Sequence, residues 1–113
     1  MEKVIIFDLD GTLINSLGDI HVALNKVLKM REAAPLDLTT VRGFIGMGSR
    51  NLVSRALTAQ NLPNDAASVA SGLNDFLDIY SAGAAELTHV FEGVRDALIH
   101  LCERNIRLGI CTN

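Results

Sequence analysis

The chain has 113 residues, 49% of them hydrophobic and 20% charged, and its formal net charge is −3. This length fits one compact domain, the hydrophobic content excludes a disordered chain, and the mild acidity argues against nucleic acid as a partner. Because no apolar run approaches the about 20 residues of a membrane span and no signal-peptide pattern is recognisable, we expect a cytoplasmic protein without a membrane partner.

A short β-branched run from Lys3 to Asp8 opens the chain, and an Asp-Leu-Asp-Gly turn signal follows it. Such a run is typical of a strand covered on both faces in a parallel sheet. Ligands of open α/β sheets bind at the carboxyl ends of these strands. Residues two apart in an extended chain point the same way, so we expect Asp8 and Asp10 to face one site, with Gly11 permitting the tight turn.

This pair of carboxylates has a chemical and a purely structural interpretation. Of Asp8 and Asp10, one can act as a nucleophile and the other as a general acid and then a general base. Together they also attract a hard cation such as Mg²⁺. The alternative is a solvated turn with an Asx hydrogen bond.

The segment 16–83 is predicted to be an all-helical insertion, here called the cap. Ser16 and Asp19 resemble a capping box, and Ser49 is the expected N-cap of a later helix. Apolar residues at helical spacing and breakers predict helices over 17–31, over 38–44, from Ser49 past Leu57, and from Pro63 to Gly83. A glycine-rich loop, 43–49, separates the second and third of these helices. We expect the helices to pack as a small bundle.

A helix ending near Asn105 and a second strand, Ile106 to Cys111, follow the cap, and Thr112 then stands at the strand end. The predicted fold is therefore α/β: a partial Rossmann-like core with the first two strands of a parallel sheet, interrupted by the helical cap. The expected division is core 1–15, cap 16–83 and core 84–113. Because sheets usually have four to six strands, two apolar strands suggest an incomplete core. We expect self-association through this incomplete core. Cys102 and Cys111 are expected to be reduced thiols in the core.

The residues at the two strand ends resemble the motifs of the haloacid dehalogenase superfamily of phosphotransferases. Asp8, Asp10 and Thr12 match its Asp-x-Asp-x-Thr motif, and Thr112 matches the Ser or Thr of its second motif. The helical insertion and the phrase Gly43-Phe-Ile-Gly-Met-Gly48 are similar to its phosphoglycolate phosphatase-like branch. The resemblance covers the whole chain.

The resemblance implies a mechanism. Asp8 would attack phosphorus to form an aspartyl-phosphate, and Asp10 would protonate the leaving alcohol and then activate water. Mg²⁺ would bind at the Asp8 carboxylate, the Asp10 backbone carbonyl and an acid further along the chain. The residues expected to bind the phosphoryl group are Gly11, Thr12, Thr112 and Asn113.

The family's Lys motif and its acidic motif lie beyond the second motif, and this chain ends at Asn113. The resemblance therefore implies a truncated portion of a Mg²⁺-dependent hydrolase that removes phosphate from a small, phosphoglycolate-like metabolite. Arg50, after the glycine loop, is a candidate partner for a substrate carboxylate, or else part of a solvated helix start. Two other hypotheses stay open: an inactive portion that acts only as a binding or dimerising module, and a receiver-type phospho-acceptor, against which the helical insertion argues.

Overall fold

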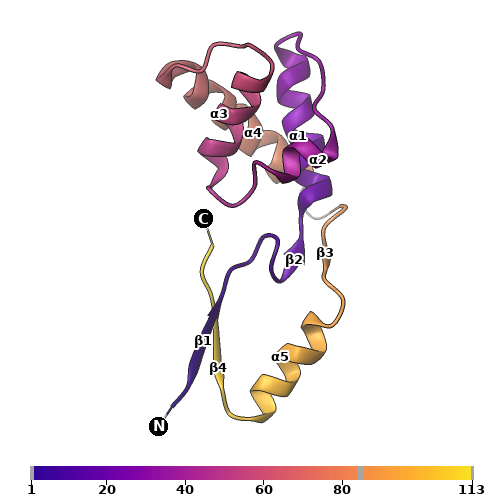
Figure 1. Cartoon of the computed structure of the whole chain (residues 1–113), viewed down its shortest axis with the longest axis vertical. Helices are drawn as coiled ribbons and strands as arrows, with labels where there is room; N and C mark the ends of the chain where they lie inside the picture. The colour runs from indigo at the N-terminus through magenta and orange to yellow at the C-terminus, as the bar shows by residue number, and fades with distance from the viewer. Residues whose placement is uncertain (1, 84–85, 113) are drawn as a thin grey trace.

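A computed structural model describes the chain at residues 2–83 and 86–112. Its elements in chain order are β1 (Val4–Phe7), β2 (Ile14–Asn15), α1 (Leu17–Met30), α2 (Leu38–Arg42), α3 (Ser49–Ala59), α4 (Ala66–Gly83), β3 (His89–Val90), α5 (Val94–Glu103) and β4 (Arg107–Ile110). The molecule is elongated, 53 × 25 × 23 Å. Helices α1 to α4 gather at one end, and β1, β4 and α5 form the other, which we call the sheet end (Figure 1).

The sheet end contains the predicted strand–helix–strand unit. β1 and β4 pair in parallel, with Val4 opposite Arg107 and Phe7 opposite Ile110. Helix α5 makes the connection, and Asn105 follows it with φ of 58°, the left-handed conformation in which helices commonly end. This pairing confirms the α/β fold class with a partial parallel sheet.

The buried core lies in the cap and draws on all four of its helices. Its fully buried side chains are Leu24, Val27, Leu28, Val41, Val53 and Leu57. α4 approaches α3 closely at Gly72, where a Cβ would lie 2.8 Å from Val53 Cγ1. Because glycine has no Cβ, the two helices can share this contact without displacing the valine.

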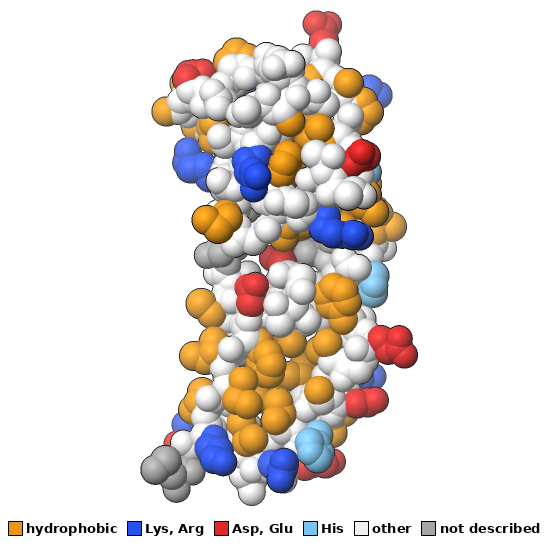
Figure 2. Space-filling model, viewed as in Figure 1, with side chains coloured by type: hydrophobic (Ala, Val, Ile, Leu, Met, Phe, Trp, Pro, Cys, Tyr) orange, Lys and Arg blue, Asp and Glu red, His pale blue; other side chains and the backbone are white. Residues whose placement is uncertain are grey.

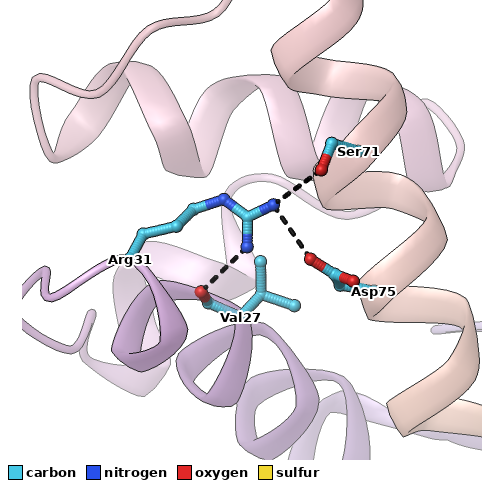
Figure 3. A network of polar contacts seen from close by, with 4 residues as sticks. All are labelled: Val27, Arg31, Ser71 and Asp75. Atoms are coloured by element: carbon cyan, nitrogen blue, oxygen red, sulfur yellow. Dashed lines mark hydrogen bonds and ion pairs between the residues drawn. The ribbon is translucent and has the colours of Figure 1, made fainter.

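A polar contact between α1 and α4 reinforces the bundle (Figure 3). Arg31 Nη2 lies 3.0 Å from Asp75 Oδ2, and Arg31 Nη1 donates to the Val27 carbonyl at 3.2 Å. Both charged side chains are about one quarter exposed, at 22% and 27%. The ion pair is therefore screened by solvent, and burial of apolar side chains contributes most of the bundle's stability.

Two helix starts differ from the sequence-based prediction. The Ser16 hydroxyl donates to Asp10 Oδ1 rather than capping α1, and Asp19 accepts from the Leu87 amide and the Thr88 hydroxyl. The capping box is therefore wrong, because both side chains bind partners in other segments. Ser49 is also not the N-cap of α3: Gly48 takes that position, without a side-chain bond.

A short pair of strands joins the cap to the sheet end. β2 and β3 are antiparallel, with Ile14 opposite Val90 and Asn15 opposite His89. The Phe91 amide extends the pairing by donating to the Leu13 carbonyl at 3.2 Å. The chain thus leaves and re-enters the sheet end through two segments that are bonded to each other.

The sheet end exposes much of its apolar surface. Val4, Ile6 and Ile110, which we call the apolar sheet residues, are 58%, 66% and 60% exposed, and α5 has no buried residue. Figure 2 shows hydrophobic side chains gathered over this part of the molecule. The expectation that Cys102 and Cys111 are core thiols is wrong, because both are exposed in the described structure; both are free cysteines. Within the same described ranges, no helix is both long and apolar enough to cross a membrane.

Candidate active site

The two strand ends meet at one cavity. Asp8 follows β1, and the Cys111 amide donates to the Phe7 carbonyl at 2.8 Å, which extends the parallel pairing beyond β4. This bond places Thr112 beside the loop that carries Asp8 and Asp10. All three side chains line a cavity of about 260 Å³ between the sheet end and the cap. The structure therefore brings Thr112 together with Asp8 and Asp10, which precede it by 104 and 102 positions.

The loop after β1 turns tightly around the Leu9 carbonyl. That carbonyl accepts from the Thr12 amide at 3.2 Å and the Leu13 amide at 2.9 Å, and Gly11 has φ of 78°. A positive φ favours glycine, so the residue at this position permits the reversal. Asp8 Oδ1 also accepts from the Leu9 amide at 3.0 Å, a local hydrogen bond to the next residue and not the bond to the second residue on that defines an Asx turn.

Gly11 and Thr12 line a second cavity, of about 470 Å³, to which Asp8 and Asp10 also contribute. Four of the predicted residues therefore share this space. Asn113, the remaining predicted phosphoryl ligand from the second strand end, lies outside the described residues.

A buried hydroxyl orients Asp10. Ser16 is 2% exposed, and its Oγ donates to Asp10 Oδ1 at 2.7 Å. This bond fixes one oxygen of the Asp10 carboxylate, and Asp10 lines both cavities. Ser16 was predicted only as a helix cap, although its position just before α1 and six residues after Asp10 also suits a contact with that carboxylate.

Helix α4 contributes a tyrosine near the same carboxylate. Burial raises the pKa of Tyr80, the negative charges of Asp10 and Asp19 raise it further, and a hydrogen bond with Ser16 opposes these effects. The Tyr80 hydroxyl therefore remains protonated as a polar group in the wall of the first cavity. Its ring stacks on Phe76, with 5.6 Å between the ring centroids.

The cap closes the first cavity with mostly apolar side chains. They come from α1, from the loop before α3, from α3 itself and from α4, and they are Ile20, Ile45, Leu52, Phe76 and Leu77. An apolar wall lowers the local dielectric constant and so strengthens electrostatic interactions beside it. The strand ends therefore carry three of the polar side chains of this cavity, and the cap supplies its apolar wall.

The two arginines that flank the glycine loop have different positions. Arg50 lines a separate surface pocket with Asn51 and Ser54, so the structure does not bring it to the Asp8 cavity. Arg42, which the sequence analysis did not consider, lines the second cavity together with Asp8 and Asp10. Both arginines are exposed, so sequence pattern alone does not separate them.

The carboxylate pair fits a magnesium ion. Mg²⁺ is usually held by one or two carboxylates, several waters and substrate phosphates rather than by a full cage of protein ligands. Asp8 and Asp10 line the same two cavities and provide such a partial set. Among the described residues no group of three His, Cys, Asp or Glu side chains suits a metal, so these two aspartates are the part of a metal site that this stretch of chain offers.

Comparison with known proteins decides the family. The family model of haloacid dehalogenase-like hydrolases matches residues 5–113. The chain belongs to the haloacid dehalogenase-like hydrolase family. A phosphoglycolate phosphatase of Cereibacter sphaeroides is 42% identical over 109 residues, which are 96% of this chain and 50% of that protein. A phosphoglycolate phosphatase of Rhodospirillum rubrum is 40% identical over 117 residues, which cover 100% of this chain and 48% of that protein.

Solved structures agree with this haloacid dehalogenase-like fold. A predicted phosphoglycolate phosphatase of Haemophilus somnus has a TM-score of 0.83 and 27% identity, covering 99% of this chain and 52% of that one. One from Lactobacillus delbrueckii subsp. bulgaricus has a TM-score of 0.90 at 22% identity, covering 99% and 54%. These findings confirm the resemblance to the family and to its phosphoglycolate phosphatase-like branch. The chain spans about half the length of these relatives.

Proposed function

We propose that the chain is the amino-terminal portion of a Mg²⁺-dependent phosphatase that removes phosphate from a small, phosphoglycolate-like metabolite. The observation that carries this proposal is the cavity in which Asp8, Asp10 and Thr112 meet at the ends of two paired strands. The names of the relatives supply the substrate class, because several of them are called phosphoglycolate phosphatase.

In the proposed reaction, an Asp8 oxygen forms a bond to phosphorus while the bond between phosphorus and the ester oxygen breaks. Asp10 gives its proton to the leaving alcohol. It then takes a proton from a water molecule, which attacks the aspartyl-phosphate, releases inorganic phosphate and restores Asp8. The hydrogen bond from Ser16 keeps Asp10 oriented for both proton transfers.

The remaining residues bind and neutralise the phosphoryl group. Gly11, Thr12, Thr112 and Asn113 are the proposed phosphoryl ligands. Asp8 and Asp10 would hold Mg²⁺, which supplies charge neutralisation when it is bound. In the proposed division, 1–15 and 84–113 form the core and 16–83 the cap. The paired strands β2 and β3, which lie next to both junctions, support this division.

The proposal predicts that a completed enzyme hydrolyses a phosphate monoester. We define the chimera as residues 1–113 joined to the half of the Cereibacter sphaeroides relative that this chain does not cover. It should release phosphate from 2-phosphoglycolate at about 1 to 1000 turnovers per second, the range of typical enzymes, and chelation of Mg²⁺ should stop it. The natural relative is the positive control. A folded chimera without turnover would contradict the proposal.

The exposed apolar sheet residues favour a second candidate function. A chain that keeps the cap and only part of the sheet could serve solely as a binding or dimerising module, because uncovered apolar surface drives association. The chimera separates the two candidates. Phosphate release requires a competent Asp8 site. A module that only binds needs no such site, and in that case the chimera should release no phosphate.

A further inference from the structure

Arg42 is the only basic residue among the described ones that line either of the two cavities at Asp8 and Asp10. It lines the second cavity from the cap, and Gly11 and Thr12 of the loop after β1 line the same cavity. This cation therefore shares a cavity with two carboxylates and with residues of the proposed phosphate site. It is therefore placed to contact a ligand that spans the space between loop and cap.

The guanidinium of Arg42 makes no ion pair or hydrogen bond with the described residues. Two other arginines of the cap are occupied: Arg31 pairs with Asp75, and Arg55 donates to the Gly43 carbonyl at 3.3 Å and lies 4.9 Å from the centre of the Phe44 ring. The planar fork of Arg42, which carries five N–H donors, is thus available to a ligand.

The backbone of Arg42 is held in place although its side chain is exposed. It is the last residue of α2, and its neighbour Val41 is fully buried in the cap core. Asp37 caps the start of this helix by accepting from the Thr40 amide at 2.7 Å. Hydrogen bonds from the side chain and the backbone of Thr40 lower the pKa of Asp37, so this cap stays ionised near neutral pH. The backbone position from which the Arg42 side chain extends is therefore fixed.

We propose that Arg42 is a specificity-determining residue that binds a second anionic group of the substrate, a carboxylate close to the phosphate ester. A carboxylate next to the phosphate would be repelled by Asp8 and Asp10, and an arginine fork binds carboxylates with two parallel hydrogen bonds. The apolar walls of the first cavity offer no other cation for it. This assignment rests on the proposed function. It makes Arg42, and not Arg50, the cap residue that contacts the substrate carboxylate.

Direct binding to the chain 1–113 tests the assignment without requiring turnover. Dissociation constants for 2-phosphoglycolate and for ethyl phosphate, which has no carboxylate, are measured by calorimetric titration in Mg²⁺. Arg42→Gln should weaken 2-phosphoglycolate binding about tenfold, the effect of one charge-assisted contact, and leave ethyl phosphate within about twofold. Arg42→Lys should retain part of the effect. Arg50→Gln, the matched control, should change neither constant.

Three results would overturn the assignment: equal weakening of both ligands by Arg42→Gln, no weakening of either, or the same selective loss in Arg50→Gln. Binding of ethyl phosphate to the unaltered chain reports the phosphate site independently of Arg42. If that binding is present, a failure concerns Arg42 alone. If the unaltered chain binds neither ligand, the assignment of Arg42 falls, whereas phosphate release by the chimera decides the proposed function separately.

Discussion

Replacing Asp8 with asparagine should abolish phosphate release by the chimera, lowering kcat by about 10⁴-fold or more, as expected when a nucleophile is removed. Asparagine keeps the size of the side chain but replaces the attacking carboxylate with a neutral amide. Because Asp8 is exposed at a strand end, the change should leave the fold intact. Phosphate release under saturating 2-phosphoglycolate measures the effect, and circular dichroism verifies folding.

The matched control for this variant is Asp78→Asn. Asp78 is an exposed carboxylate on α4 that lines neither cavity at Asp8, so the same chemical change there should leave kcat within about twofold. Near-parent turnover in Asp8→Asn would exclude the covalent mechanism. An equal loss in Asp78→Asn would show that the effect is one of net charge or stability.

The chain 1–113 alone should self-associate through the sheet end. The apolar sheet residues Val4, Ile6 and Ile110 are each more than half exposed, and the edges of β1 and β4 that face away from each other are unpaired in the described structure. Apolar surface and open strand edges both favour association. We therefore expect a concentration-dependent dimer or larger species in sedimentation velocity. The half of the Cereibacter sphaeroides relative that this chain does not cover, added as a separate polypeptide, should compete with this association.

Ile6→Lys should weaken this association about hundredfold or more, because a buried, unpaired ammonium group costs several kcal/mol. The Ile6 side chain lies over Gly109 of the neighbouring strand, so the lysine would stand in the middle of the contact surface. Val22→Lys also replaces an apolar residue with lysine, at an exposed position on α1, and should not change the association. A monomer at every concentration, or equal dissociation by both variants, would contradict a contact through the sheet end.

The strand ends were predictable from sequence because local patterns specify them. An apolar β-branched run followed by acids defines Asp8 and Asp10, and a second such run places Thr112 at the same edge of a parallel pair. The cap was predictable for a similar reason. Its apolar residues recur at helical spacing, and the side chains on that stripe, Leu24 and Leu28 among them, are the ones that the bundle buries.

Contacts between distant segments were not predictable. Ser16 and Asp19 have the spacing of a capping box, but Asp19 binds Leu87 and Thr88, which follow it by 68 and 69 residues. The β2–β3 pair has only two residues per strand, too few for an alternating pattern. Arg42 and Arg50 look alike in sequence, and only the folded cap places Arg42 in the wall of the cavity that Asp8 and Asp10 line and Arg50 in another.

Chemical trapping of the covalent intermediate tests the central claim most directly. The chimera is mixed with 2-phosphoglycolate and Mg²⁺, quenched in acid and treated with borohydride, which reduces an aspartyl-phosphate to homoserine. Peptide mass spectrometry then locates the reduced residue. We predict homoserine at position 8, dependent on substrate and absent from Asp8→Asn. Steady phosphate release with an unmodified Asp8, or with the label on another residue, would contradict the account.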